Sequence, residues 1–141
     1  MKKYQIGYTT GVFDLFHIGH LNILRRAKEQ CEYLIVGVST DELVETYKNR
    51  APIINFESRK RIIEAIKYVD RVVAQESRDK LSALNHLKFN VMFVGSDWRD
   101  SSLFNELEVK LKEQDVDLIY LDYTDEISST IIAQKLTNNN I

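Results

Sequence analysis

The stretch Gly11-Val12-Phe13-Asp14-Leu15-Phe16-His17-Ile18-Gly19-His20 decides how the rest of the chain is interpreted. A pattern typical of a short strand, over residues 4–8, precedes it, and a helical pattern over residues 21–28 follows it. The stretch is therefore predicted to be a strand-to-helix turn that opens an α/β unit. Such a turn aims free backbone N–H groups and the positive end of a helix dipole at one point, which suits a phosphate. His17 and His20 stand at this helix start, and Gly19 between them leaves room for a ligand to approach the backbone.

The composition is that of one soluble globular domain. Of the 141 residues, 44% are hydrophobic and 28% are charged, and the formal net charge is −2. This charge gives no overall basic field for nucleic acid, and no apolar run is long enough to cross a bilayer. The single Cys31 excludes an internal disulfide and a multi-cysteine zinc site. We therefore expect a cytoplasmic protein with no nucleic-acid partner and no membrane insertion, with one domain over residues 1–137 and a frayed tail over residues 138–141.

Strand-like and helix-like segments alternate along the chain. Strands are predicted over residues 4–8, 33–38, 71–74, 90–95 and 117–121, and helices over 21–28, 39–47, 56–69, 79–86, 102–114 and 131–137. This alternation predicts a single-domain, doubly wound (Rossmann-like), mostly parallel five-stranded sheet. Ligands of such sheets bind at the carboxyl ends of the strands, near the point where the strand order reverses. The candidate functional residues follow predicted strands or begin predicted helices, so we expect them to gather at that edge.

The two histidines are interpreted as phosphate-binding residues. Being three positions apart at a helix start, both can face one ligand. As metal ligands they lack a third partner, because His86 is the only other histidine, and no residue is assigned to a metal. Asp14 is a carboxylate beside a phosphate site. We interpret it as a structural residue that accepts backbone N–H bonds, with help in holding Mg²⁺ as the alternative.

The run from Gly11 to His20 resembles the HxGH motif of the nucleotidyltransferase superfamily, and its Phe13-Asp14 pair is similar to that of the cytidylyltransferase branch. The resemblance implies the nucleotidyltransferase fold and the transfer of CMP from CTP, with Mg²⁺, to a phosphorylated alcohol, which gives a CDP-alcohol and pyrophosphate. Glycerol 3-phosphate is the expected acceptor, because the short chain and Gly95-x-Asp97-Trp98 resemble that branch. Phosphocholine, phosphoethanolamine and other phospho-alcohols remain open. The resemblance also implies a homodimer.

The resemblance assigns roles to residues of this chain. His17 and His20 would stabilise the reacting triphosphate, Lys48 would neutralise the acceptor phosphate, and Arg59 would bind nucleotide phosphate or pair with a carboxylate to hold the site together. These four are the expected catalytic residues. Gly11 is expected to permit a tight turn, and Asp70 to be a structural residue that closes a helix onto the next strand. Lys80 and Trp98 join Lys48 as expected acceptor contacts. The expected nucleotide contacts are Gly11, Val12, Phe13, Gly19, Arg50, Asp97, Tyr123, Ile127, Ser128, Ser129 and Thr130.

The last motif departs from the family pattern. Tyr123 and Glu126 replace an arginine and a glycine, whereas the helix-capping run from Ile127 to Thr130 is kept. The loss of a triphosphate-binding arginine should weaken CTP binding unless Arg99 substitutes for it. The changes at Tyr123 and Glu126 keep open a nucleotide-binding regulatory protein that has lost catalysis. A sugar-phosphate adenylyltransferase also stays open, because the same fold and HxGH motif serve both bases, and the most general alternative is a flavodoxin-like module. That module leaves the paired histidines unexplained.

Overall fold

The computed structural model describes residues 2–96, 99, 101–122 and 129–138. Helices and strands alternate along it, as the sequence predicts. In chain order they are β1 (Tyr4–Gly11), α1 (Ile18–Gln30), β2 (Cys31–Ser39), α2 (Asp41–Lys48), α3 (Phe56–Glu64), β3 (Arg71–Gln75), α4 (Lys80–Leu87), β4 (Val91–Gly95), α5 (Ser102–Glu113), β5 (Asp117–Leu121) and α6 (Ser129–Asn138).

The five strands form one sheet in the order β3-β2-β1-β4-β5, and each neighbouring pair is parallel. The chain fills one side of β1 with β2 and β3, and then crosses to the other side with β4 and β5. The strand order therefore reverses between β1 and β4, which is where ligands of doubly wound sheets bind. The predicted fold class is confirmed.

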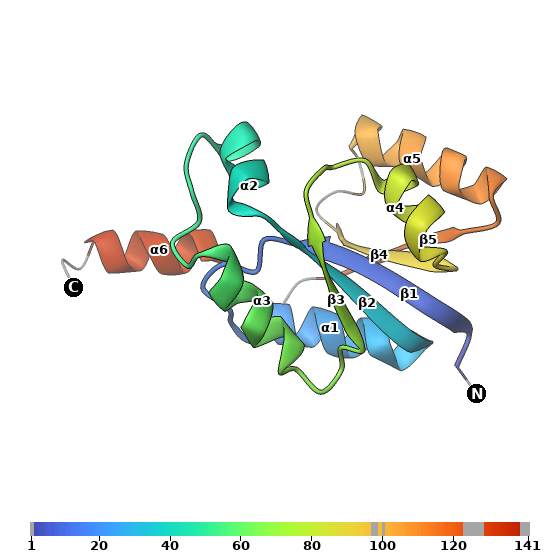
Figure 1. Ribbon diagram of the computed structural model, residues 1–141, viewed down its shortest axis with the longest axis horizontal. Coiled ribbons are helices and arrows are strands. Elements are labelled where there is room, and N and C mark those ends of the chain that lie inside the picture. The colour runs from blue at the N-terminus through green and yellow to red at the C-terminus, as the bar shows by residue number, and fades with distance from the viewer. Residues whose placement is uncertain (1, 97–98, 100, 123–128, 139–141) are drawn as a thin grey trace.

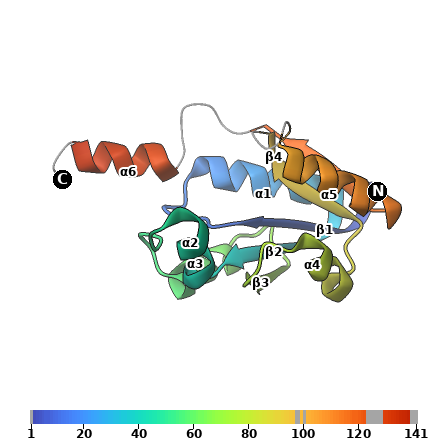
Figure 2. The same cartoon turned by 90° about the horizontal axis from the view of Figure 1, so that it is seen from above.

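Helices cover both faces of the sheet (Figure 1). Alternate residues of β2 point to opposite faces. Leu34 and Val36 join the core cluster that contains Leu24 of α1 and Ile63 of α3, whereas Ile35 joins the cluster that contains residues of α4 and α5. α6 lies apart from the sheet, beyond the carboxyl end of β1, in both views of the molecule (Figures 1 and 2). None of the described helices has the length and apolar character needed to cross a membrane.

Several elements differ in length from the prediction: α1 begins at Ile18 and β2 at Cys31, both earlier than predicted, and β1 and α3 end elsewhere than predicted. β1 continues to Gly11, because Thr9 and Thr10 stay paired with β2 and the Thr9 hydroxyl donates a 2.9 Å hydrogen bond to the Phe93 carbonyl. α3 ends at Glu64 instead of reaching residue 69. Beyond it the chain continues in turns, in which the Ile66 N–H bonds to the Ile63 carbonyl. Ile66 and Val69 still pack against the core from these turns, which is why the apolar pattern extends past the helix.

Candidate active site

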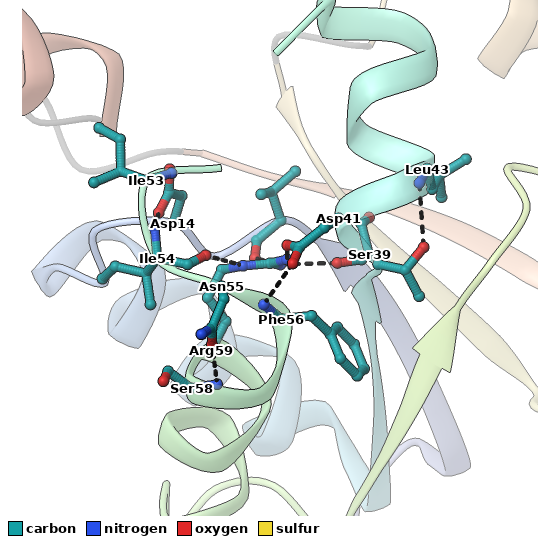
Figure 3. A network of polar contacts seen from close by, with 12 residues as sticks. Asp14, Ser39, Asp41, Leu43, Ile53, Ile54, Asn55, Phe56, Ser58 and Arg59 are labelled. Carbon is teal, nitrogen blue, oxygen red and sulfur yellow. Dashed lines mark hydrogen bonds and ion pairs between the residues drawn. The ribbon is translucent and has the colours of Figure 1, made fainter. Parts of the chain in front are cut away.

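The loop between β1 and α1 is held by the side chain of Asp14. Its two carboxylate oxygens accept backbone N–H bonds from Ile53 at 2.8 Å and from Ile54 at 2.9 Å (Figure 3). Oδ1 also accepts the Leu15 N–H at 3.1 Å. The turn itself is made by Phe13 and Leu15, whose φ angles are 56° and 49°. Asp14 thus ties this loop to the segment before α3, which is the structural arrangement that we expected of it.

His17 and His20 together cap the amino end of α1. His17 is the N-cap residue, and its Nδ1 accepts a 3.0 Å bond from the Gly19 N–H. His20 Nδ1 accepts a 3.3 Å bond from the His17 N–H, so the two side chains form a reciprocal capping box. Their rings stack with centroids 3.9 Å apart and an interplanar angle of 25°. The two imidazoles are therefore fixed side by side at the start of the helix.

The cap determines which nitrogen of each histidine is free for a ligand. A backbone N–H can only donate, so each Nδ1 is an acceptor, and the proton of the neutral ring is on Nε2. Burial lowers the pKa of His17 and is the main cause that lowers the pKa of His20 to about 4, so both rings are neutral at pH 7. Within the described residues, His17 Nε2 is buried and has no hydrogen-bond partner. A buried, unpaired donor at a helix amino end suits a phosphate oxygen.

Arg59 is fully buried and makes its hydrogen bonds with the protein (Figure 3). Its guanidinium donates to the carbonyls of Ile54 at 2.8 Å, Val12 at 2.7 Å and Ser39 at 2.8 Å, and to Asp41 Oδ1 at 2.6 Å. Of the two expected roles, the structure therefore supports pairing with a carboxylate. Its assignment as a catalytic residue is corrected to that of a positioning residue, because the side chain joins the ends of β1 and β2 to α2 and α3 from below the surface.

Lys48 and Arg50 lie next to the loop after β1, in a recess that Val12 and Asp14 of this loop also line. Both side chains are exposed, and they line this small recess with Asp14 and Pro52. Ala133 of α6 lines the same recess. The structure thus brings the two predicted phosphate-binding cations close to the loop that leads to the histidines.

A cavity of about 350 Å³ opens at the carboxyl ends of β1 and β4, between α4 and α5. Thr10 and Gly11 of β1 and Gly95 of β4 line its floor, and Lys80 lines its wall. Lys80 is half-buried, and burial lowers its pKa to about 8, with Arg78 nearby acting in the same direction. The cavity lies on the α4 and α5 face of the sheet, whereas α1 packs on the opposite face.

The glycine and loop residues expected at the nucleotide have structural contacts. Gly11 ends β1 without a positive φ, so its part in the turn is not a left-handed backbone conformation. Its missing side chain instead makes room for the Phe13 ring, since a Cβ there would lie 3.0 Å from that ring. Phe13 is buried with its ring 5.4 Å from that of His20, edge to face. Val12 accepts a hydrogen bond from Arg59, and Gly19 is buried in the first turn of α1.

Asp70 lies where its predicted structural role requires. Its carboxylate accepts a 2.8 Å bond from the Leu34 N–H and pairs with Lys28, so it joins β2 and α1 just before β3 begins. Arg99 stacks over the Tyr120 ring at 5.3 Å. Several predicted contacts lie outside the described residues, namely Asp97, Trp98, Tyr123, Glu126, Ile127 and Ser128. Ser129 and Thr130 are described only as the first two residues of α6.

Three residues of this region were missed by sequence reasoning. Asp41 is the carboxylate partner of Arg59, and its position in the first turn of α2 indicated only a favourable helix start. Arg78 lines the cavity, and its guanidinium lies over the Tyr47 ring at 4.6 Å. These two residues are 31 positions apart, and no local pattern signals their contact.

Comparison with known proteins agrees with this geometry. Residues 8–135 match the family profile described as cytidylyltransferase-like. The glycerol-3-phosphate cytidylyltransferase of Staphylococcus aureus is 36% identical over 129 residues, which cover 91% of this chain and 92% of that protein. The protein of the same name from Bacillus subtilis is 36% identical over 130 residues, which cover 91% of this chain and 94% of that protein.

Solved structures share the fold. A lipopolysaccharide core biosynthesis protein from Thermoplasma volcanium has a TM-score of 0.71 at 25% identity, over 86% of this chain and 97% of that chain. Pantothenate synthetase from Thermus thermophilus has a TM-score of 0.68 at 14% identity, over 94% of this chain and 62% of that chain, a likeness of fold alone. The predicted nucleotidyltransferase is thus confirmed at the level of the family, and the chain belongs to the cytidylyltransferase-like family.

Proposed function

We propose that this protein transfers CMP from CTP to glycerol 3-phosphate and releases pyrophosphate. The family match over residues 8–135 supports cytidylyl transfer. The acceptor is supported by the relatives from Staphylococcus aureus and Bacillus subtilis, whose names give glycerol 3-phosphate as their substrate. The observation that carries the proposal is the histidine pair, with Nε2 of His17 buried and unpaired within the described residues at the start of α1.

The reaction is a direct displacement at phosphorus. An oxygen of the acceptor phosphate forms a bond to the α-phosphorus of CTP while the bond from that phosphorus to the bridging oxygen breaks, and pyrophosphate leaves with that oxygen. Negative charge grows on the leaving group and on the α-phosphoryl oxygens. The Nε2–H donors of His17 and His20 would stabilise this charge, because they are fixed in place before the reaction begins.

The two faces of the sheet suit the in-line geometry. The attacking and leaving oxygens lie on opposite sides of the α-phosphorus. The cavity beside Lys80 opens on the α4 and α5 face, and the histidines begin α1, which covers the other face. The acceptor would occupy the cavity and the pyrophosphate would leave toward α1, with the reaction taking place over the carboxyl end of β1.

The remaining charged residues would neutralise phosphates. Lys48 and Arg50 line the recess beside the loop after β1, so they would contact the acceptor phosphate and the triphosphate where these two groups meet over the end of β1. Asp97, Trp98, Tyr123 and residues 127–130 stay predicted contacts of the nucleotide or acceptor. Among the described residues, no group of three histidine, cysteine or acidic side chains is placed to hold a metal. We propose that Mg²⁺ enters bound to the triphosphate, as part of the substrate.

The proposal includes a homodimer in the cytoplasm. Ile18, the first residue of α1, and Ile53, whose N–H bonds to Asp14, are 50% and 57% exposed. Apolar side chains exposed this close to the site would be covered in a dimer that meets at the histidine loop. Sedimentation equilibrium of the wild type, and of a variant with Ile18→Lys and Ile53→Lys, tests this.

Pyrophosphate release tests the reaction. CTP, ATP, GTP and UTP are each combined with Mg²⁺ and with glycerol 3-phosphate, phosphocholine, phosphoethanolamine or a sugar phosphate. We expect turnover with CTP and glycerol 3-phosphate. Turnover with ATP and a sugar phosphate alone would replace the proposal by an adenylyltransferase. Tight CTP binding in calorimetry without turnover of any acceptor would replace it by a nucleotide-binding regulatory protein.

A further inference from the structure

The wall of the 350 Å³ cavity carries two cations that have no ion-pair partner within the described part of the chain. Arg78 and Lys80 both line it, at the start of α4. No carboxylate oxygen of the described residues lies within 4.0 Å of either side chain's nitrogens. Asp79 stands between them in sequence, but its Oδ1 accepts from the Leu81 and Ser82 N–H groups at 3.1 Å, as the cap of α4.

Arg78 and Lys80 repel each other at one cavity wall, and the charge of Asp79, which also lines the cavity, opposes the effect of Arg78 on the Lys80 pKa only in part. The Lys80 side chain is half-buried, and both this burial and the charge of Arg78 lower its pKa. A phosphate between the two cations would remove this repulsion and form charge-assisted hydrogen bonds to both. The planar guanidinium of Arg78 can bind two phosphate oxygens at once.

Tyr47 holds Arg78 in position. The guanidinium carbon lies 4.6 Å from the centre of the Tyr47 ring, a distance at which the cation and the ring attract each other. Tyr47 belongs to α2 and directly precedes Lys48 in the chain. The contact therefore links α2, which carries one predicted phosphate-binding cation, to the segment before α4.

Within the described residues, the cavity lining has no cage of exposed aromatic rings for a positively charged headgroup. α5 contributes Glu106 and Lys110, which carry opposite charges. The aromatic rings in the lining are Phe93 and Phe104, whose side chains are buried in the core at 1% and 8% exposure. A quaternary ammonium is bound by the exposed faces of several rings. Among the described lining residues, the cations Arg78, Lys80 and Lys110 outnumber the carboxylates Asp79 and Glu106, so a cationic acceptor would enter a lining of net positive charge.

We propose that Arg78, held against Tyr47, is a specificity-determining residue that binds the acceptor phosphate together with Lys80 and selects acceptors that carry no positive charge. The inference rests on the proposed function, since it assigns this cavity to the acceptor. It deepens that function by separating glycerol 3-phosphate and uncharged polyol phosphates from phosphocholine and phosphoethanolamine.

Charge variants of Arg78 test the proposal. Rates of pyrophosphate release at saturating CTP and Mg²⁺ give KM and kcat for glycerol 3-phosphate and for phosphoethanolamine. We expect Arg78→Ala to raise the KM for glycerol 3-phosphate by about 10- to 100-fold, the effect of losing a charged hydrogen bond, with kcat and the KM for CTP little changed. Arg78→Glu should raise it further and lower the KM for phosphoethanolamine. Arg71→Ala is the matched control, because Arg71 is an exposed arginine at the far end of β3.

Variants of Tyr47 test how Arg78 is held. Tyr47→Phe keeps the ring and should leave the KM for glycerol 3-phosphate unchanged, whereas Tyr47→Ala should raise it less than Arg78→Ala does. In the Tyr47→Ala/Arg78→Ala double variant, the loss should equal that of Arg78→Ala alone, because Tyr47 acts through Arg78. Additive losses would overturn this part of the inference.

Calorimetric titration with glycerol 3-phosphate distinguishes failure of the Arg78 inference from failure of the proposed function. Turnover of glycerol 3-phosphate with an unchanged KM in Arg78→Ala would overturn the inference and leave the proposed function intact. Binding of glycerol 3-phosphate that depends on Arg78, without turnover, would support the site and overturn the reaction. Wild-type protein that neither binds nor turns over glycerol 3-phosphate would overturn both.

Discussion

At the scale of single residues, each histidine of the pair uses one ring nitrogen for the helix and leaves the other for a ligand. Nδ1 of both rings accepts a backbone N–H at the start of α1, so Nε2 carries the proton. The sequence predicted two histidines facing one ligand. It did not predict the cap, because histidine is not among the residues preferred at a helix N-cap. The stacking of the two rings depends on their positions in space, which the three-residue spacing of the histidines does not determine.

Variants that keep the cap separate catalysis from stability. Asparagine is a favourable N-cap residue and glutamine is favourable three positions later, so His17→Asn and His20→Gln retain acceptors for the two backbone N–H groups. Both remove the Nε2–H donor. We expect each to lower kcat for pyrophosphate release by about 10²–10³-fold, the usual effect of losing one donor to a reacting oxyanion. The free energy of unfolding, from urea denaturation, should change little.

His86 provides the matched control. It is exposed on α4, and its Nδ1 contacts the Ser82 carbonyl within the same helix. His86→Gln should leave kcat unchanged. If His17→Asn is less stable and the unfolded fraction accounts for its lower kcat, then the two histidines cap α1 and have no catalytic role.

At the scale of elements, Arg59 joins segments that are distant in sequence. Its acceptors, Val12, Ser39, Asp41 and Ile54, follow β1, end β2, begin α2 and precede α3. The sequence predicted either this kind of role or phosphate binding, and could not decide between them. Which of the two roles Arg59 has depends on the acceptors that surround its buried guanidinium, and these come together only when the four elements pack. Asp14 was easier to interpret, because a carboxylate beside phosphates already disfavours contact with them.

Arg59→Lys should destabilise these joined elements. A lysine carries a single ammonium and cannot reach the four acceptors of a guanidinium fork, so buried carbonyls and Asp41 would lose their partners. We expect the free energy of unfolding to fall by about 2–4 kcal/mol, measured by urea denaturation. Arg61→Lys, an exposed position on the same helix, should change it by less than about 0.5 kcal/mol. An equal loss in both variants would show that Arg59 does not act through these bonds.

The order of the strands and helices could be predicted from the sequence, but some of their ends could not. Strand and helix order was predicted correctly, because alternating short apolar runs and 3.6-residue patterns are local. The end of α3 was not predicted, since Ile66 and Val69 pack on the core from turns and continue the apolar pattern. The far end of β1 was missed because Thr9 is polar, although its hydroxyl is satisfied inside the sheet by the Phe93 carbonyl.

At the scale of the whole molecule, the topology assembles the candidate site. With the order β3-β2-β1-β4-β5, the loop after β1, the cavity beside β4 and the start of α4 meet at one edge. The doubly wound pattern predicted this gathering. The contact of Tyr47 with Arg78 could not be predicted, because it depends on how α2 and the segment before α4 are placed around that edge.

The folded molecule should lose stability in mild acid through its buried histidines. The pKa of His20 is lowered from 6.5 to about 4, and that of His17 is also lowered. Between these pH values the unfolded chain binds more protons than the folded protein. The free energy of unfolding should therefore fall as the pH is lowered from 6.5 toward 4, by at most about 1.4 kcal/mol per pH unit from His20, and His17 should add to the fall below 6.5.

Urea denaturation at several pH values, compared between wild type and His20→Gln, isolates this effect. Carboxylates act alike in both proteins, and Asp117, whose pKa is held below its ordinary value of 3.8 by Tyr4 and Lys112, acts only under more acidic conditions. The stability difference between wild type and His20→Gln should thus shrink or reverse as the pH falls, since glutamine does not titrate. With three histidines in the chain, NMR titration can follow each ring, assigned from His17→Asn, His20→Gln and His86→Gln. If the His20 ring titrates near 6.5, it is not buried as the cap requires, and in that pH range its Nδ1 would be protonated and could no longer accept the His17 N–H.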